Sequence, residues 1–183
     1  NQGNNMHPSS VNNMRIIRSK YLQYLETIPT PKVCDVGGLY DAPHKSYLRL
    51  FEDIPGIQWT VCDIVKHPSV DYVMVGPYAL PFPDQTFDLV VSGQMLEHCS
   101  NPFKSVAEMK RVLKIGGRLA LAAPSSGPRH DVQDGWRFMD DAFRFIAEDI
   151  GGIEIISDWI DKTAPDERSR KWQDHLFVGK RIA

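Results

Sequence analysis

The sequence predicts an α/β fold, a mostly parallel sheet with helices on both faces. Short apolar runs alternate with amphipathic helical segments, a pattern that favours a parallel sheet covered on both sides. The last two apolar runs have only a loop between them, which predicts an antiparallel edge. With 183 residues, the chain is long enough for one domain with a sizeable core. We therefore expect one domain over residues 1–183, with a helical cap in residues 1–30 and a ligand-binding core in residues 31–183.

The composition is that of an ordinary globular protein, with 42% hydrophobic and 24% charged residues. The net charge of −2 and the absence of a basic run disfavour a nucleic-acid-binding protein. Three scattered cysteines, without a CxxC pair, predict neither a disulfide framework nor a structural zinc site. No apolar stretch reaches membrane-spanning length, and the N-terminal residues lack the apolar region of a signal peptide. We expect a cytoplasmic protein without a bound metal.

Seven strands are expected from the apolar runs. They cover residues 32–36, 57–64, 70–75, 87–92 and 118–123, followed by a final pair at 153–160 and 174–181.

Helix signals fall between these strands. A first helix is expected to begin at Ser9 or Ser10 and to end before Pro29. A second starts near Pro43. A third has Asn101 as its cap, Pro102 in its first turn and two glycines, at 116 and 117, as its stop signal. A fourth covers residues 139–150.

A two-glycine turn, Gly37–Gly38, comes directly after the first strand, and Asp63 closes the second strand 26 residues after Gly37. Ligands of open α/β sheets bind at this end of the strands, and an acid at that distance is placed to meet a ribose diol. Glycine also lets the backbone approach a ligand closely. The GxGxxG spacing of a pyrophosphate-binding loop is missing, because Leu39 and Tyr40 follow the glycines. A nicotinamide or flavin enzyme is therefore disfavoured.

Two later segments carry a family resemblance. LPFPDQTFDLVVSGQMLEHCSNP (residues 80–102) and MKRVLKIGGRLALAAP (residues 109–124) resemble class I S-adenosylmethionine-dependent methyltransferases of the small, type 11-like kind. The resemblance implies a Rossmann-like seven-stranded sheet of order 3-2-1-4-5-7-6 with strand 7 antiparallel. It also implies a methyltransferase that uses S-adenosylmethionine and releases S-adenosylhomocysteine.

Carried over by position, the resemblance implies a set of cofactor-binding residues. The turn residues would hold the methionine part, Asp63 and its neighbour the ribose, the segment after the third strand the adenine, and the exit of the fourth strand the reacting methyl. In that order they are Asp35, Gly37, Gly38, Asp63, Ile64, Tyr78, Ala79, Leu80, Ser92, Gly93 and Gln94.

Two departures from the family pattern keep an alternative open. The second and third glycines of DxGxGxG are replaced, and Gly76 stands where an acid often bonds the adenine amino group. The alternative is a catalytically weak methyltransferase-like domain that binds S-adenosylmethionine, its product or a partner protein.

The acceptor is expected to be a small molecule or a glycan. The short link after the second strand and the segment HDVQDGWRFMDDAF (residues 130–143) are similar to methyltransferase-like proteins of sugar and cell-surface polysaccharide pathways. Trp136 and Arg137 would form a wall for the acceptor, and Tyr21 on the first helix would close over the site; the alternative for Trp136 is packing under the loop, and the favoured alternative for Tyr21 is packing in the core.

Methyl transfer is an in-line displacement at a sulfonium carbon, so alignment supplies much of the rate and no metal is required. A general base helps when the acceptor must lose a proton. His98, after the fourth strand, is the first candidate, with a histidine bonded only to backbone at a helix end as the alternative. His130 and Asp131, on the loop after the fifth strand, form a second candidate pair.

Overall fold

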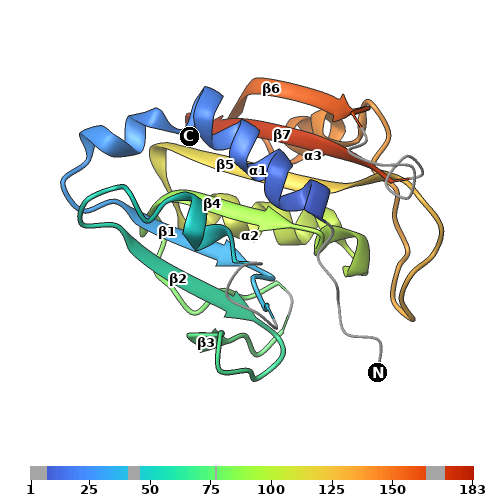
Figure 1. Ribbon diagram of the computed structural model, residues 1–183, viewed down its shortest axis with the longest axis horizontal. Helices are drawn as coiled ribbons and strands as arrows, with labels where there is room; N and C mark the ends of the chain where they lie inside the picture. The colour runs from blue at the N-terminus through green and yellow to red at the C-terminus, as the bar shows by residue number, and fades with distance from the viewer. Residues whose placement is uncertain (1–7, 41–45, 77, 164–171) are drawn as a thin grey trace.

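The computed structural model describes residues 8–40, 46–76, 78–163 and 172–183. Seven strands form one sheet of order β3-β2-β1-β4-β5-β7-β6 (Figure 1). Strand β7 runs antiparallel to both of its neighbours, whereas the pairs among β1 to β5 are parallel. The predicted sheet order is therefore confirmed. The strands are β1 (Lys32–Val36), β2 (Gln58–Asp63), β3 (Tyr72–Val73), β4 (Phe87–Gly93), β5 (Leu113–Ser126), β6 (Ile153–Asp161) and β7 (Gln173–Arg181).

Helices cover the two faces of this sheet. Helix α1 (Pro8–Tyr21) crosses one face, together with the short 3-10 helices η1 (Gln23–Thr27) and η3 (Tyr47–Leu50). Helices α2 (Pro102–Val112) and α3 (Ala142–Ile150) lie against the opposite face (Figure 1). A third 3-10 helix, η4 (Leu96–His98), follows β4 at the carboxyl end of the strands.

Two hydrophobic cores result from the alternation of side chains along the strands. In β4, Leu89 and Val91 face the α1 side, where they pack with Met14. Val90 faces the α2 and α3 side, where it belongs to the cluster that contains Phe143. Because β4 is buried on both faces, it appears in the sequence as a continuous apolar run rather than an alternating one.

The start of α2 confirms the sequence prediction. Asn101 Oδ1 accepts a hydrogen bond of 3.1 Å from the backbone N–H of Lys104, and Pro102 occupies the first turn. The end of α2 was predicted wrongly. The helix stops at Val112 and β5 begins at the next residue, so Gly116 and Gly117 lie within the strand. There they accompany a register shift, because Phe87 pairs with Leu113 and Leu89 pairs with Arg118.

Other boundaries differ from the predicted ones. Helix α1 already contains Ser9 and Ser10, so neither is its cap. Helix α3 begins at Ala142, three residues later than expected, and β3 has only two residues. The expected helix near Pro43 falls partly on residues 41–45, outside the described residues. Beyond them, the chain forms only the four-residue turn η3, in which Ser46 Oγ accepts from the backbone N–H of Leu48 at 3.1 Å.

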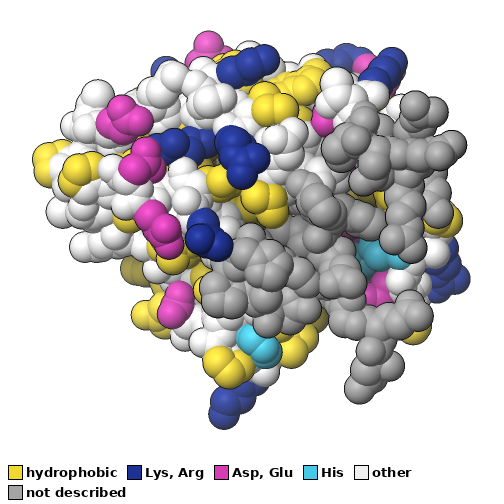
Figure 2. Space-filling view, viewed as in Figure 1, with side chains coloured by type: hydrophobic (Ala, Val, Ile, Leu, Met, Phe, Trp, Pro, Cys, Tyr) yellow, Lys and Arg dark blue, Asp and Glu magenta, His cyan; other side chains and the backbone are white. Residues whose placement is uncertain are grey.

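The face shown in Figure 2 carries acidic and basic side chains interspersed, without a large patch of one sign among the described residues. In the described part of the chain, every helix is too short or too polar to cross a bilayer.

Candidate active site

A cavity of about 470 Å³ opens at the carboxyl ends of β1, β2 and β4. Its volume lies in the range typical of small-molecule sites. The ends of parallel strands, η4 and the loop between β5 and α3 all contribute to its wall. The lining residues are Gly37, Asp63, Ile64, Met74, Met95, Glu97, His98, Cys99, Ser100, Gln133, Asp134 and Gly135.

The two-glycine turn forms one wall of the cavity. Gly37 has φ of 75°, and its backbone N–H donates to the carbonyl oxygen of Cys62 at 2.8 Å. A Cβ atom at this position would collide with the Met95 side chain. Glycine is therefore required here both by the positive φ and by the close approach of Met95.

Asp35 lies beneath this turn in β1, where its side chain is 2% exposed. A Cβ atom on Gly38 would lie 2.6 Å from Asp35 Cγ, so Gly38 also makes room for this carboxyl group. Burial, and secondarily the charge of Asp63, raises the pKa of Asp35 to about 8. Asp35 is therefore largely protonated at neutral pH in the unliganded protein.

Asp63 and Ile64 form the cavity wall at the end of β2. Asp63 Oδ1 accepts a hydrogen bond of 2.9 Å from the backbone N–H of Val65, which fixes the carboxylate at the strand end. Ile64 is an exposed large apolar side chain beside it. Asp63 and Gly37 thus occupy the same cavity, as their places in the sequence predicted.

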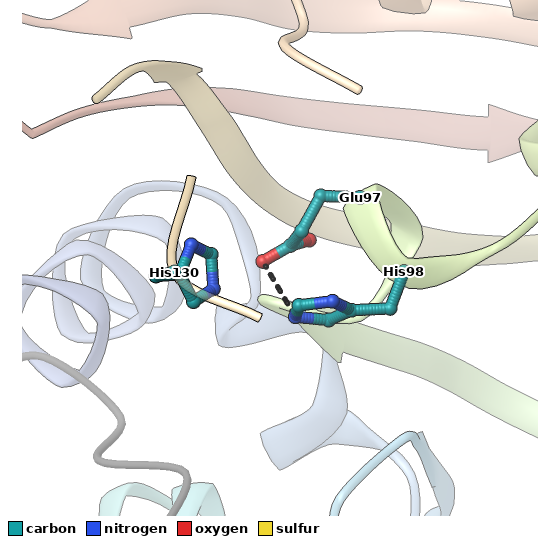
Figure 3. Close-up of side chains that lie close together, drawn as sticks. All are labelled: Glu97, His98 and His130. Atoms are coloured by element: carbon teal, nitrogen blue, oxygen red, sulfur yellow. Dashed lines mark ion pairs between the residues drawn. The ribbon is translucent and has the colours of Figure 1, made fainter. Parts of the chain in front are cut away.

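Glu97, in η4, is fully buried, with an exposed fraction of 0%. Among the described residues, neither of its carboxylate oxygens has a hydrogen-bond partner. Burial raises the pKa of Glu97 to about 8, and the negative charges of Asp174 and Asp134 act in the same direction. Its carboxyl group points toward the rings of His98 and His130 (Figure 3).

His98 is held by contacts on both of its ring nitrogens. Its Nδ1 bonds the backbone carbonyl of Gln133, and its Nε2 lies 3.6 Å from Glu97 Oε1. A carbonyl oxygen can only accept, so Nδ1 carries the proton and Nε2 of the neutral ring keeps its lone pair.

His130 lies on the loop between β5 and α3. Its Nδ1 is 3.0 Å from Asp134 Oδ2, and its ring meets the His98 ring edge to face, with centroids 5.2 Å apart. Desolvation lowers the pKa of His130, against the opposing charge of Asp134.

A salt bridge shapes the loop that carries His130. Arg137 donates to both carboxylate oxygens of Asp134, at 2.5 and 2.8 Å, and to the carbonyl oxygens of Gly127 and Pro128. Its guanidinium holds the pKa of Asp134 well below the usual range. The backbone N–H of Gly135 also donates to the carbonyl oxygen of Glu97 at 2.9 Å, which joins the loop to η4.

The three residues predicted at the exit of β4 form the floor next to the cavity rather than its lining. Ser92 Oγ donates to the carbonyl oxygen of Val36 at 2.7 Å. Gly93 lies beneath the ring of Tyr47, where a Cβ atom would collide with the phenol. Gln94 has φ of 58°, and its backbone N–H donates to the carbonyl oxygen of Ala122 at 2.9 Å.

The predicted adenine-side segment also stands outside the cavity lining. Tyr78 hydroxyl lies 2.5 Å from Ser100 Oγ and accepts from the backbone N–H of Asn101 at 2.8 Å. Ala79 is exposed, and Leu80 is buried with its N–H donating to Glu108 Oε1 at 2.8 Å. The position of Gly76 is open, because a Cβ atom there would meet nothing within 4 Å.

Four further candidates lie outside the cavity lining. Asp131 is exposed, and the carboxylate that contacts His130 belongs to Asp134 instead. Trp136 donates from Nε1 to the carbonyl oxygen of Cys99 at 2.8 Å and lines, with Arg137, a neighbouring hollow of about 450 Å³. Tyr21 accepts from Ser157 Oγ at 2.9 Å, and its ring packs against Trp159 on the α1 face.

Sequence reasoning missed the part played by Asp134 and Met95, and it missed the burial of Glu97. Glu97 adjoins His98 in the LEH stretch, so its position was visible, but its complete burial was not. Asp134 follows His130 by four residues in a loop, where spacing alone does not predict a contact.

Residues 56–121 match the family described as "Methyltransferase domain". The chain is 32% identical over 108 residues to the ubiquinone/menaquinone biosynthesis C-methyltransferase UbiE of Cronobacter sakazakii, covering 56% of this chain and 43% of the relative. It is 30% identical over 112 residues to the demethylmenaquinone methyltransferase of Renibacterium salmoninarum, covering 57% and 47%. The chain thus spans less than half the length of these curated relatives.

Solved structures share the fold at low identity. The putative methyltransferase in complex with the Trm112 methyltransferase activator, from Haloferax volcanii, has a TM-score of 0.63 at 18% identity, covering 96% of this chain and 95% of that one. The YcgJ protein of Bacillus subtilis has a TM-score of 0.67 at 17% identity, covering 97% and 100%. The sequence similarity is thus to a methyltransferase domain over residues 56–121, and the solved structures share the fold of the whole described sheet.

Proposed function

We propose that this chain binds S-adenosylmethionine in the 470 Å³ cavity and transfers its methyl group to a small-molecule acceptor. One observation carries the proposal. The same cavity has the Gly37 turn and Asp63 on one wall and the Glu97–His98 pair on another. The first wall suits a nucleoside with a cationic tail, and the second suits a group that must lose a proton.

On the cofactor wall, the carboxylate of Asp63 would accept hydrogen bonds from the ribose hydroxyls. Ile64 would pack against the adenine, and the Gly37 turn would bring backbone groups close to the methionine part. Asp35 lies behind this turn, and a nearby cationic ligand would favour its ionised form.

On the acceptor wall, we assign the role of base to His98. The acceptor atom attacks the methyl carbon, the bond from carbon to sulfur breaks, and S-adenosylhomocysteine leaves as a neutral thioether. When the acceptor carries a proton, Nε2 of His98 takes it, because Nδ1 already donates to Gln133. His130 completes the acceptor side in this proposal, whereas Asp131 lies exposed on the same loop, and Trp136 and Arg137 line the neighbouring hollow.

Two acceptor classes are the first to test. The curated relatives are named for methylation in quinone biosynthesis, which supports a quinone-related ring. The segment at residues 130–143 supports a sugar. Met74, Met95 and Ile64 give the cavity an apolar wall, which fits a ring of either class on one face.

Calorimetric titration with S-adenosylmethionine and S-adenosylhomocysteine tests the cofactor assignment. We expect binding of both ligands. The variant Gly37→Val should abolish it, because the new side chain would collide with Met95. The matched control Ala107→Val, which adds the same branched side chain at an exposed position of α2 outside the cavity lining, should bind as the unchanged protein does. No heat with either ligand would overturn the proposal.

A second candidate function is a domain that binds the cofactor or its product but transfers methyl groups weakly or not at all. Gly76 favours it, because the place of the adenine-side acid is empty and its surroundings are open. A structural neighbour with a TM-score of 0.62 at 17% identity is the [4+2]-cyclase SpnF, so this fold also serves other chemistry. Binding of S-adenosylhomocysteine without methyl transfer to a demethylated quinone or a sugar nucleotide would favour this candidate.

A further inference from the structure

The geometry points to a divalent-metal site at the acceptor end of the cavity. We propose that Glu97, His98 and His130 bind a transition-metal ion such as Zn²⁺. Each residue offers one ligand atom, and these atoms lie within 4.8 Å of one another. Figure 3 shows the carboxyl group of Glu97 between the two imidazole rings.

Glu97 provides the first argument. Its side chain is completely buried, and among the described residues neither carboxylate oxygen has a hydrogen-bond partner. A buried carboxylate without partners is costly, so such groups are normally paired or bound to a metal. The carboxyl group is directed into a cavity, where an ion has access to it.

The orientation of the histidines provides the second argument. His98 Nδ1 bonds the backbone carbonyl of Gln133, and His130 Nδ1 lies 3.0 Å from the carboxylate of Asp134. Histidines that ligate metals usually donate their other ring N–H to a carbonyl or a carboxylate, as His98 does to Gln133. In His98, Nε2 is thereby left as a lone-pair donor toward Glu97.

The distances fit a small ion. His98 Nε2 and Glu97 Oε1 are 3.6 Å apart. Two ligands at about 2.0–2.2 Å from a tetrahedral zinc ion lie roughly 3.4 Å apart. His130 is the least buried of the three, and its ligand atom lies within 4.8 Å of those of Glu97 and His98.

The donor set also indicates the class of ion. Two imidazoles and one carboxylate suit Zn²⁺, Co²⁺ or Fe²⁺ rather than Mg²⁺ or Ca²⁺, which prefer oxygen ligands. Three protein ligands leave a position open toward the cavity, as in catalytic zinc sites. An acceptor oxygen bound there would lose its proton more easily, and His98 would act as a ligand instead of a base.

This inference does not rest on the proposed methyl transfer, since the ion can be tested without cofactor. The untagged full chain, stripped with a chelator, would be titrated with Zn²⁺ by calorimetry. We expect a single equivalent to bind, and the separate variants Glu97→Gln, His98→Ala and His130→Ala to weaken binding by at least about tenfold. The matched control is His67→Ala, whose histidine contacts Ser69 away from the cluster.

A second measurement does not depend on the variants remaining folded. Addition of Co²⁺ to the unchanged protein should give visible absorption bands of a low-symmetry site, without a thiolate-to-metal charge-transfer band. The metal site would be overturned if the unchanged protein failed to bind Zn²⁺, or if the three variants bound Zn²⁺ as tightly as the unchanged protein. A thiolate-to-cobalt band from Cys99 would overturn it as well. Titration of Glu97→Gln with S-adenosylhomocysteine separates the two proposals, because the cofactor wall is intact in that variant.

Discussion

At the scale of single residues, two buried carboxyl groups stand out. Asp35 lies beside Gly38, outside the cavity lining, whereas Glu97 lines the cavity, and burial raises the pKa of each to about 8. A buried carboxyl group with a raised pKa is more compatible with the folded state in its protonated form than in its ionised form. Each unit of pKa difference between the folded and unfolded states changes stability by roughly 1.4 kcal/mol. At a pH where they ionise, both carboxyl groups lower the stability of the folded protein, which is consistent with a role in binding.

Asp35 makes the stability of the unliganded protein depend on pH. Its folded-state pKa of about 8 exceeds the ordinary value of 3.8, so its favourable contribution is complete below that value and is lost as the pH rises toward 8. We expect the free energy of unfolding to fall between pH 5 and about 8, and to fall less steeply in Asp35→Asn. Urea unfolding across this range checks it, with Glu52→Gln, an exposed acid, as the control.

Asp63 has a different role, because its partly exposed carboxylate lines the cavity. We expect Asp63→Ala to weaken the binding of S-adenosylhomocysteine by about tenfold or more, since it would remove the proposed paired contact to the ribose diol. Calorimetry measures the change. Asp53→Ala, which removes a surface carboxylate paired with Arg18, is the control. Unchanged affinity in Asp63→Ala would mean that the ribose lies elsewhere.

His98 is expected to affect turnover more than cofactor binding. In His98→Ala, the proposed proton acceptor is lost while Asp63 and the Gly37 turn remain, so kcat should fall and the affinity for S-adenosylhomocysteine should change little. Steady-state kinetics with an identified acceptor, beside calorimetry, measures both. If kcat and the affinity for S-adenosylhomocysteine fell by the same factor, His98 would be a cofactor ligand. If a chelator also lowers kcat of the unchanged protein, the metal role is favoured over the base.

At the scale of elements, the strands were more predictable than their ends. Strand β1 was predicted at its observed residues, because a short apolar run bounded by prolines and glycines leaves few alternatives. Strand β5 is much longer than predicted, since its pairing with β7 continues from Arg118 to Ser126. That pairing depends on β7, which is distant in the sequence, so no local pattern in β5 predicts it.

The cap of α2 is an element whose contribution can be measured. Asn101 satisfies the backbone N–H of Lys104 at the helix start, next to the loop that carries η4. We expect Asn101→Ala to lower the free energy of unfolding by about 1 kcal/mol. Asn101→Asp, which keeps an acceptor at this position, should retain most of the stability. Urea unfolding of both variants tests this, and a loss in Asn101→Asp equal to that in Asn101→Ala would argue against the cap.

At the scale of the whole molecule, the first helix is joined to the last strand. Helix α1 packs on β5 and β7, and Met14 and Ile17 are fully buried there. Asn13 donates from Nδ2 to Asp174 Oδ2 at 2.9 Å, a buried contact between segments near opposite ends of the chain. The helical cap expected in residues 1–30 is therefore part of the main hydrophobic packing on its face of the sheet.

Met14→Ala tests whether helix α1 unfolds in the same transition as the sheet. We expect the free energy of unfolding to fall by about 2–5 kcal/mol, because a cavity is left in the core. Tryptophan fluorescence and far-ultraviolet circular dichroism should report the same midpoint. Arg15→Ala, on the exposed side of the same helix, should change the midpoint little. Separate transitions in Met14→Ala would show that α1 unfolds independently of the sheet.

The sequence by itself determined the places of the strands and of Gly37 and Asp63, and the resemblance of residues 80–102 and 109–124 to class I methyltransferases implied the strand order. Gly37 and Asp63 could be located because each is tied to a strand end, and the ends of neighbouring parallel strands meet at one edge of a sheet. Local patterns of apolar residues, glycines and prolines contain this information, since they act over a few residues.

Only the tertiary structure decided which side chains meet on the opposite wall. Glu97 and His98 come from η4, whereas His130 and Asp134 come from a loop some thirty residues later, and their contact depends on how that loop folds back. The burial of Glu97, which underlies the proposed metal site, is likewise set by segments that are distant in the chain. Contacts of this kind leave no periodic signal, because their spacing in the sequence reflects loop length and not geometry.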